Sequence, residues 1–212
     1  MQEDIFLESE ADAWYERNKS SLSHDREHLK WLLNELRPFE DEINDVAEIG
    51  CASGINLNFL CSNLKAKGIG IDPSKLAIES ATRSFTDKDL EFSVGTADSL
   101  WLQTDSCDLV YVGFCLYLVS EEKISLALDE ILRIVKPGGF IAITDFDYGE
   151  YIEVPYSHDN RVTTFKRDYH KLILQKNIGV YLVSKTSFSH FANTFNPIRN
   201  ERVSTCIFYK EK

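Results

Sequence analysis

The chain has 212 residues and a formal net charge of −11, because 34 Asp and Glu outnumber 23 Lys and Arg. Hydrophobic residues make up 43% of the chain and charged residues 27%, which is typical of a globular protein and excludes collagen-like, disulfide-scaffolded and largely disordered classes. The acidic balance argues against a general nucleic-acid-binding protein, because contacts to phosphates need clustered Lys and Arg. We therefore expect one globular domain that does not bind nucleic acid.

Two further features bear on the compartment. No apolar run reaches the roughly 18 residues that a membrane-spanning helix needs, and the N-terminus is acidic where a signal peptide would be basic and then apolar. We therefore expect a cytoplasmic protein without membrane contact. The five cysteines form no Cys-x-x-Cys pair, which predicts reduced, buried thiols and no metal site.

The first part of the chain predicts a helical cover. Residues 1–23 are polar, with Trp14 and Tyr15 among them. Ser23 is placed to cap a helix that runs to about Arg37. From residue 45 onward, short apolar strands alternate with helices of 3.6-residue periodicity. The expected strands are residues 46–49, 68–71, 90–94, 108–114 and 140–144, the expected helices are residues 55–64, 73–85 and 120–135, and residues 137–139 form a turn.

The last part of the chain changes character. Residues 161–176 predict a helix, and residues 180–188 and 203–209 predict two strands that pair antiparallel. Strand–helix alternation is typical of a parallel sheet covered by helices on both faces. The predicted fold class is therefore α/β, a Rossmann-like, doubly wound, mostly parallel seven-stranded sheet that ends in an antiparallel strand pair. Within a single domain we expect a helical cover in residues 1–44, a cofactor-binding core in residues 45–145, and an acceptor-pocket insertion, a helix and the final strand pair in residues 146–212.

A loop rich in small residues follows the first expected strand, at the place where an open α/β sheet binds ligands. Gly50, Ala52 and Gly54 let a ligand approach the backbone closely, and the next helix offers free N–H groups to an anionic group. Asp72 ends the second expected strand, where a carboxylate can accept both hydroxyls of a ribose. These positions predict a site for a nucleotide-type cofactor.

Two kinds of cofactor compete for this arrangement. A dinucleotide site has the pattern Gly-x-Gly-x-x-Gly, whose third glycine would stand at position 55, and this chain has Ile55. The acidic Glu48 also suits a ligand with a cationic amino group better than it suits a pyrophosphate. A nicotinamide-dependent oxidoreductase is therefore the less favoured alternative.

Five segments, in order between residues 46 and 145, resemble those of the class I S-adenosylmethionine-dependent methyltransferases. They are Glu-Ile-Gly-Cys-Ala-Ser-Gly at 48–54, Gly-Ile-Asp-Pro-Ser at 70–74, Gly-Thr-Ala-Asp-Ser-Leu at 95–100, Cys-Asp-Leu-Val-Tyr at 107–111 and Arg-Ile-Val-Lys-Pro-Gly-Gly at 133–139. The chain departs from the family pattern at Ala52, where the family usually has Gly. The resemblance implies S-adenosyl-L-methionine as the cofactor.

The resemblance also implies roles for individual residues. Glu48 would anchor the amino group of the cofactor, directly or through water. Asp72 would bind its ribose hydroxyls, and Asp98 would accept a hydrogen bond from its adenine amine. The implied cofactor-binding residues are Glu48, Gly50, Cys51, Ala52, Gly54, Asp72, Pro73, Ala97, Asp98, Ser99 and Phe114.

The sequence has no signature that identifies a general base, which is needed only when the attacked group keeps its proton at neutral pH. In the fold that the resemblance implies, the acceptor pocket lies above the carboxyl ends of the fourth and fifth strands, under the N-terminal and late segments. The candidate catalytic residues there are His158, whose intrinsic pKa suits a base, Asp145 and Tyr117. The candidate acceptor-pocket residues are Trp14, Tyr15, Arg17, Tyr148, Tyr156, Arg161 and Lys166.

Residues 161–185 reverse the charge of the chain, with six Lys and Arg against one Asp. This reversal indicates either a rim that attracts an anionic acceptor or a solvated helix face. The predicted function is methyl transfer from S-adenosyl-L-methionine to an oxygen or nitrogen of a small-molecule acceptor, such as an anionic metabolite or a sugar, by a monomer or homodimer. The alternatives are the nicotinamide-dependent oxidoreductase and a catalytically silent, cofactor-binding partner subunit.

Overall fold

The computed structural model describes residues 1–22, 27–86, 89–176, 179–192 and 194–212. Its strands are β1 (Asp45–Ile49), β2 (Lys67–Asp72), β3 (Leu90–Val94), β4 (Cys107–Gly113), β5 (Val135–Pro155), β6 (Thr163–Asp168), β7 (Val180–Ser189) and β8 (Arg202–Lys210). Its α-helices are α1 (Gln2–Ile5), α2 (Ala11–Asn18), α3 (Glu27–Leu36), α4 (Ile55–Leu64), α5 (Lys75–Ser84), α6 (Glu121–Ile134) and α7 (Tyr169–Gln175). The shorter turns of helix are η1 (Phe6–Glu10), η2 (Arg37–Glu42), η3 (Leu116–Leu118) and η4 (Arg199–Glu201). The predicted cap Ser23 lies outside the described residues.

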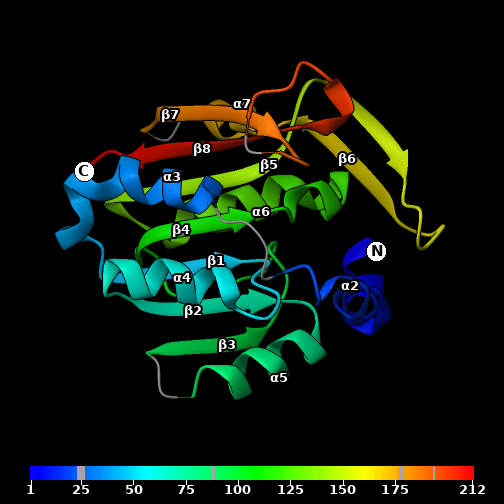
Figure 1. Cartoon of the computed structure of the whole chain (residues 1–212), viewed down its shortest axis with the longest axis horizontal. Helices are drawn as coiled ribbons and strands as arrows, with labels where there is room; N and C mark the ends of the chain where they lie inside the picture. Colours follow the sequence, from blue (N-terminus) through cyan, green and yellow to red (C-terminus); the bar gives the residue numbers. More distant parts are fainter. Residues whose placement is uncertain (23–26, 87–88, 177–178, 193) are drawn as a thin grey trace.

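One mixed sheet organises the molecule (Figure 1). Its strands lie in the order β3-β2-β1-β4-β5-β8-β7, and β6 pairs with β5 beside this path. Neighbours among β1 to β5 are parallel, whereas β8 lies antiparallel to both β5 and β7. The predicted Rossmann-like α/β fold with a final antiparallel pair is therefore confirmed, and β6 is an additional strand.

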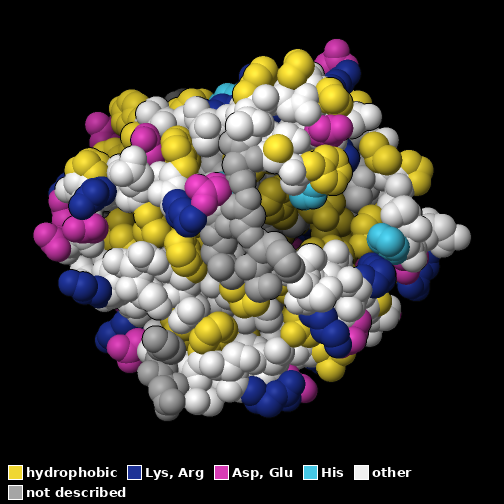
Figure 2. All heavy atoms as spheres, in the orientation of Figure 1, with side chains coloured by type: hydrophobic (Ala, Val, Ile, Leu, Met, Phe, Trp, Pro, Cys, Tyr) yellow, Lys and Arg dark blue, Asp and Glu magenta, His cyan; other side chains and the backbone are white. Residues whose placement is uncertain are grey.

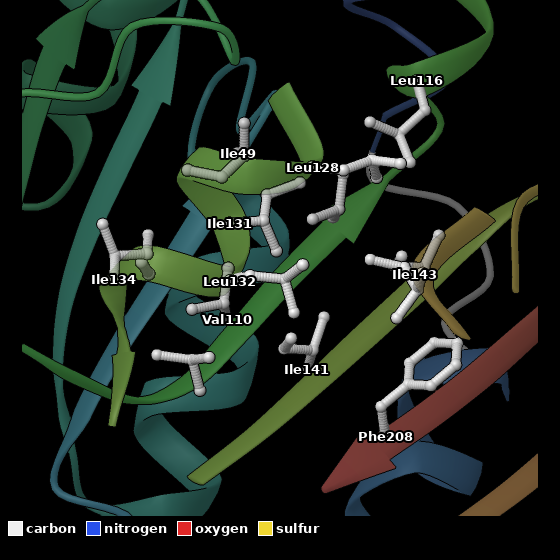
Figure 3. Close-up of a cluster of buried hydrophobic side chains, with 14 of the residues drawn as sticks. Ile49, Val110, Leu116, Leu128, Ile131, Leu132, Ile134, Ile141, Ile143 and Phe208 are labelled. Atoms are coloured by element: carbon white, nitrogen blue, oxygen red, sulfur yellow. The ribbon is translucent and has the colours of Figure 1, made fainter. Parts of the chain in front are cut away.

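The alternation of side chains along β4 builds a core on each face of the sheet. Val110 and Val112 pack in a buried cluster with α6 and α7, whereas Leu109 and Tyr111 pack in a second cluster with α3 and α4. Figure 3 shows the first cluster, in which side chains of α6 point toward those of β4 and β5. A strand that is covered on both faces explains the near-continuous apolar run in this part of the sequence.

The N-terminal helices lie beyond the carboxyl ends of the parallel strands (Figure 1). Asp12 of α2 accepts a hydrogen bond from the Ser74 hydroxyl at 2.7 Å, which ties α2 to the start of α5. Gln2 of α1 donates to the Leu118 carbonyl at 2.6 Å and exchanges two hydrogen bonds with the backbone of Thr163. The first residues of the chain thus close over the edge at which parallel sheets bind ligands.

The prediction of one helix over residues 161–176 is wrong. Residues Thr163–Asp168 form β6, and the helical part is Tyr169–Gln175. Residues 163–168 form a strand because β5 extends far enough to pair with them in antiparallel fashion. The periodicity of a single segment does not reveal such a partner strand. The β-branched and aromatic residues at 163–165 also suit a strand better than a helix.

The strand β5 is also longer than predicted and absorbs the turn expected at residues 137–139. It begins at Val135, takes the bend at Gly138 with a φ of +86°, and runs to Pro155. Its first half pairs with β4 and β8, and its last residues pair with β6. One strand therefore carries the chain from the core of the sheet to the side of the N-terminal helices (Figure 1).

The helices are short and pack by one face. In α6, the longest of the described helices with 14 residues, Ile124, Leu128 and Ile131 are buried at helical spacing. Within the described residues, no helix is long and apolar enough to cross a membrane. The five cysteines are unpaired, and four of them are buried.

We expect Leu128→Ala to lower the free energy of unfolding by about 2–5 kcal/mol, because it leaves a cavity in the core under α6. The matched control is Leu126→Ala on the same helix, whose side chain is exposed and whose loss should change stability by less than about 0.5 kcal/mol. Urea unfolding followed by circular dichroism measures both values. Equal effects of the two substitutions would contradict the position of the core.

Candidate functional site

A cavity of about 590 Å³ opens at the carboxyl edge of β1, β2 and β4. Its wall combines the N-terminal helices, the loops after β1, β2 and β3, the residues that follow β4, and the turn after β7. Hydrophobic side chains line the visible part of this hollow in Figure 2. Its volume lies in the range of sites that enclose a small molecule.

The loop after β1 shapes one part of the cavity wall and depends on glycine. Gly50 has a φ of +77°, and a Cβ there would lie 2.7 Å from Cβ of Cys115. Gly54 has a φ of +72°, and its Cβ would lie 2.4 Å from the ring of Phe92. A residue larger than glycine is therefore excluded at both positions, because the positive φ disfavours a side chain and because a Cβ would clash with its neighbours. Ala52 lies between them with a φ of +45°, a conformation that disfavours a side chain.

The carboxylate of Asp72 holds this loop in place. Its Oδ2 accepts a hydrogen bond from the Ala52 amide and its Oδ1 accepts one from the Ser74 amide, each at 2.8 Å. Burial raises the pKa of Asp72 to about 6, although these two backbone N–H groups act against the shift. A carboxylate oxygen can accept more than one hydrogen bond, and Asp72 lines the cavity. It can therefore also accept hydrogen bonds from a ligand.

Asp98 lies in another part of the same wall. Its Oδ2 pairs with Lys123 at 3.0 Å, whereas its Oδ1 is buried and has no hydrogen-bond partner among the described residues. Burial alone would raise the pKa of Asp98, but the Thr96 hydroxyl and the Lys123 ammonium outweigh it and hold the pKa below its ordinary value. A buried, charged oxygen without a partner is a place where a ligand can supply a donor.

Glu48 lies beneath the loop rather than in the cavity wall. It is almost completely buried, and it bonds to the side chain of Asn56 and to the backbone of Leu57 in the first turn of α4. Burial raises the pKa of Glu48 well above its ordinary value, and the two hydrogen bonds offset this only in part. In this structure Glu48 supports the loop and the start of α4, and its anchoring of the amino group, directly or through water, stays a prediction.

The structure brings together most of the residues implied to bind the cofactor. Those in the cavity wall are Gly50, Cys51, Ala52, Asp72, Pro73, Ala97, Asp98 and Phe114. Glu48 and Gly54 underlie the loop instead. The exposed Ser99 lies outside the wall, where its amide donates to the Thr96 carbonyl at 3.3 Å and closes the turn that presents Ala97 and Asp98.

Aromatic rings line a further part of the cavity. Phe114 follows β4 with a φ of +51°, and its ring centre lies 5.4 Å from that of His190 and 6.3 Å from that of His28. Phe146 of β5 lies 5.1 Å from Tyr117 and 6.1 Å from His190. These five residues, which we call the aromatic cluster, come from four separate segments of the chain. They form a wall that suits a flat or apolar group.

The three predicted catalytic residues do not meet at one point. Tyr117 lies in the cavity wall, and burial raises its pKa well above the ordinary value, so its hydroxyl stays protonated at neutral pH. Asp145 is buried outside the wall, where its Oδ1 accepts from the Phe146 amide at 2.7 Å and its Oδ2 from the Tyr117 amide at 3.3 Å. His158 is exposed outside the wall, with its ring 5.2 Å from that of Tyr156. The role of Asp145 in this structure is to position its two neighbours.

Of the predicted acceptor-pocket residues, Trp14 lies in the described cavity wall, and its indole bonds to the Tyr117 hydroxyl. Tyr15 and Tyr148 are buried away from the wall. The Tyr148 hydroxyl donates to Asn200 at 2.7 Å, so it serves the packing of the late loops.

Arg17 and Tyr156 form an outer bracket rather than a pocket wall. Arg17 pairs with Glu10 and donates to the Tyr156 hydroxyl at 3.1 Å. Tyr156 in turn packs on the small buried cluster that contains Phe6 and Val162. This bracket connects the N-terminal helices to the turn between β5 and β6.

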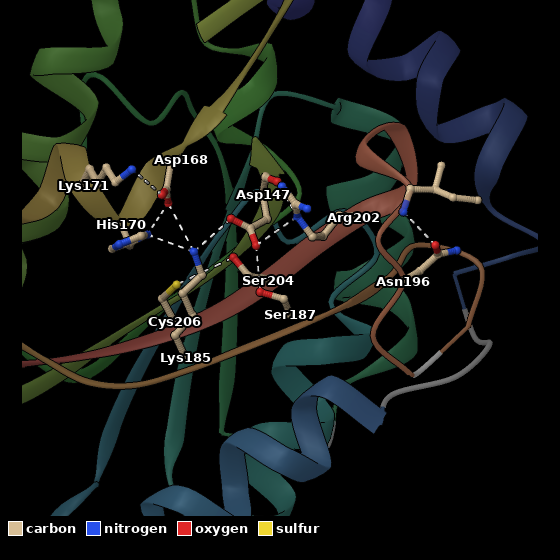
Figure 4. Close-up of polar contacts among 11 residues, drawn as sticks. Asp147, Asp168, His170, Lys171, Lys185, Ser187, Asn196, Arg202, Ser204 and Cys206 are labelled. Carbon is tan, nitrogen blue, oxygen red and sulfur yellow. Dashed lines mark hydrogen bonds and ion pairs between the residues drawn. The ribbon is translucent and has the colours of Figure 1, made fainter. Parts of the chain in front are cut away.

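The Lys and Arg of residues 161–185 are mostly taken up by ion pairs, so they do not form the basic rim that we considered. The pairs are Arg161–Asp159, Arg167–Glu121, Lys171–Asp168, Lys176–Asp129, Lys185–Asp147 and Lys185–Asp168. Figure 4 shows Lys185 between the carboxylates of Asp147 and Asp168. Lys166 differs, because its Nζ lies 4.0 Å from the ring centre of Phe146 in the cavity wall.

Sequence reasoning missed the two histidines of the aromatic cluster. Burial and the nearby Lys166 lower the pKa of His190, which keeps the imidazole neutral at neutral pH. The sequence signal for His190 was its place two residues after the predicted strand 180–188, in a loop of the kind that often carries functional residues. His28 lies in a predicted helix, and nothing in the local pattern indicated that it faces a cavity.

We expect Ala52→Gly to raise the free energy of unfolding by about 1 kcal/mol, because glycine adopts a positive φ without the cost that a Cβ imposes. The control is Ala66→Gly, a position without positive φ, where the same substitution should lower stability by about 0.5–1 kcal/mol. Urea unfolding compares the two. A loss of stability at both positions would contradict the backbone conformation of the loop.

We expect Asp145 to make stability fall as the pH rises. Burial raises its pKa to about 7 in the folded protein, so the folded state holds a proton that the unfolded chain releases from about pH 4 upward. Between these values the unfolding free energy of the wild type should decline relative to that of Asp145→Asn, by up to about 1.4 kcal/mol per pH unit. If the stability curves of the wild type and of Asp145→Asn run parallel from pH 4 to 8, the prediction is wrong. The control is Asp41→Asn at an exposed site, whose curve should run parallel to that of the wild type.

Part of the chain is similar to known methyltransferase sequences. Residues 46–139 match a family model described as a methyltransferase domain. An uncharacterised methyltransferase of Schizosaccharomyces pombe is 28% identical over 114 residues, which is 54% of this chain and 43% of the yeast protein. The match therefore spans less than half of the length of that relative.

Solved structures share the fold. A SAM-dependent methyltransferase from Methanosarcina mazei superposes with a TM-score of 0.67 at 18% identity, over 83% of this chain and 96% of that one. The protein assigned as a methyltransferase in complex with the Trm112 activator of Haloferax volcanii gives a TM-score of 0.64 at 21% identity, over 95% and 96% of the two chains. Residues 46–139 are therefore similar to a methyltransferase domain, and the chain shares the fold of solved methyltransferases.

Proposed function

We propose that this protein transfers the methyl group of S-adenosyl-L-methionine to an oxygen or nitrogen of a small-molecule acceptor. The observation that carries the proposal is one cavity in which Asp72, Asp98 and the loop after β1 share a wall with the aromatic cluster. Asp72, Asp98 and the loop suit a nucleoside that carries a charged side chain. The aromatic cluster suits an apolar or flat acceptor beside that nucleoside. Donor and acceptor would then meet inside one enclosed space.

The residues present fit the cofactor. The loop residues Gly50, Cys51, Ala52 and Ser53 line the cavity and carry only small side chains, so a ligand can lie close to the backbone. The carboxylate of Asp72 suits two adjacent hydroxyls, and the orphaned Oδ1 of Asp98 suits an amine. These three features match the amino-acid, ribose and adenine parts of S-adenosyl-L-methionine, whose sulfonium supplies an electrophilic methyl group.

The protein's contribution to methyl transfer would be alignment and the exclusion of water. An in-line displacement from a cation to a neutral nucleophile creates no new charge, so the enzyme gains most by holding the reactants at contact distance. The helices α1 and α2 close the cavity from above, and Asp12 and Gln2 tie them down. Trp14 and Tyr117 then separate the reacting groups from solvent.

The acceptor would lie against the aromatic cluster. If its nucleophile is a hydroxyl, the neutral His190 is placed to take the proton, whereas the protonated Tyr117 can only donate a hydrogen bond. Lys166 adds positive charge behind Phe146 and supports an anionic or sugar-type acceptor. The other basic residues of that segment give no such support, since they are paired with carboxylates.

The division of labour that we propose follows the chain. Residues 45–145 hold the cofactor, and residues 1–44 and 146–212 supply the cover and the acceptor side of the cavity within one domain. The state of assembly that we propose is a monomer or homodimer. The Haloferax volcanii relative is solved in a complex with the Trm112 activator, so a small activator protein is the other partner that a size measurement should consider.

The experiment that tests the function is calorimetric titration with S-adenosyl-L-methionine and with NAD⁺, followed by a screen for transfer of labelled methyl to carboxylates, sugars, phenols and amines. We expect binding of the first ligand and not of the second. Binding of NAD⁺ alone would favour the oxidoreductase, and cofactor binding without transfer to any acceptor class would favour the silent subunit.

We expect Asp72→Ala to weaken S-adenosyl-L-methionine binding by at least about tenfold, because two ribose hydroxyls lose a charged acceptor. The matched control is Asp41→Ala, an exposed residue outside the cavity, which should leave the affinity unchanged. Calorimetry gives the affinities, and thermal unfolding verifies that both variants are folded. Unchanged affinity of a folded Asp72→Ala variant would reject the ribose assignment.

A further inference from the structure

Glu3 is a buried carboxylate in the cavity wall that the cofactor motifs do not explain. It lies on α1, is 9% exposed, and lines the same cavity as Asp98. Its Oε1 accepts a hydrogen bond from the Ser120 amide at 2.8 Å, at the start of α6. Its Oε2 is buried and has no hydrogen-bond partner among the described residues. Such an atom is costly unless a ligand satisfies it.

The position of Glu3 relative to Asp98 follows from the two neighbouring residues at the start of α6 that they contact, one each. Glu3 bonds to Ser120, and Asp98 pairs with Lys123 one turn further along α6. The charge of Asp98, and more weakly that of Glu3, raises the pKa of Lys123. The cavity therefore has two orphaned carboxylate oxygens, one from the N-terminal helix and one from the loop after β3, at the start of the same helix.

A neutral primary amine on an aromatic ring matches this pair. It has two N–H donors in one plane, and each donor that is buried without an acceptor costs about 1–3 kcal/mol. Asp98 provides one orphaned oxygen and can satisfy one donor. The second donor needs another acceptor, and Oε2 of Glu3 is held ready because Oε1 is fixed by the backbone of α6.

We propose that Glu3 binds the exocyclic amine of the adenine together with Asp98, so that the N-terminal helix contributes to recognition of the cofactor base. The proposal rests on the proposed function, since it takes the bound nucleoside to be that of S-adenosyl-L-methionine. The consequence of the proposal is that α1 must lie over the cavity for the protein to select adenine over other bases. A base that carries a carbonyl in place of the amine would place an acceptor against two carboxylates.

The experiment compares S-adenosylhomocysteine with S-inosylhomocysteine, in which a carbonyl replaces the amine and the adjacent ring nitrogen N1 carries a hydrogen. The variant is Glu3→Gln, which keeps the side-chain size and lets the amide oxygen accept from Ser120 while its NH₂ replaces the orphaned oxygen. We expect the wild type to prefer the adenosine ligand. Glu3→Gln should lower the ratio of the two affinities by at least about tenfold, because the amide repels the amine and donates to the carbonyl.

The matched control is Asp4→Asn on the same helix, an exposed carboxylate that does not line the cavity and should leave both affinities unchanged. Glu3→Ala provides a second variant, which should weaken the adenosine ligand more than the inosine ligand. An equal loss for both ligands, or no change in their ratio, would show a merely structural role and overturn the assignment. If the folded wild type binds neither ligand, the proposed function itself fails, and this outcome is distinct from the others.

Discussion

The carboxylate of Asp72 is the interaction on which the candidate site depends. It ends β2, accepts the amide of Ala52 in the loop after β1, and accepts the amide of Ser74 at the start of α5. One buried side chain thus sets the positions of two successive strand-to-helix connections at the same edge of the sheet. Ser74 is itself bonded to Asp12, so the N-terminal cover is held by the same chain of contacts. The shape of the cavity follows from this arrangement before any ligand is considered.

Position relative to the cavity separates the acidic residues of the site into two groups. Glu48 and Asp145 are enclosed by protein, and backbone or amide donors from neighbouring segments bind their carboxyl groups. They position the loop after β1 and the residues after β4. Glu48, Asp98 and Glu3 each keep one buried oxygen without a partner among the described residues, but of these three only Asp98 and Glu3 line the cavity. The first group supports the structure of the site, and the second group is available to a ligand.

The basic residues of the late segment show why charge along a sequence is a weak guide to a binding surface. Lys185 lies on β7 and reaches Asp147 on β5 and Asp168 on β6, so strand pairing brings opposite charges together (Figure 4). A helix over residues 161–176 would have placed these side chains differently. Lys166 affects the cavity because β6 pairs with the end of β5, next to Phe146.

The sequence by itself determined the Rossmann-like core and the positions of the cofactor loops. Each strand and helix from residue 45 to residue 145 has a local hydrophobic period, and the loop of Gly50 and the carboxylate of Asp72 directly follow strands, so local pattern is sufficient there. Only the tertiary structure decided which residues face the acceptor. Glu3, His28 and His190 reach one cavity through contacts between segments far apart in the chain, and β6 exists because β5 continues far enough to pair with it. Periodicity within a segment contains no information about such partners, which explains why His158 was predicted and His190 was missed.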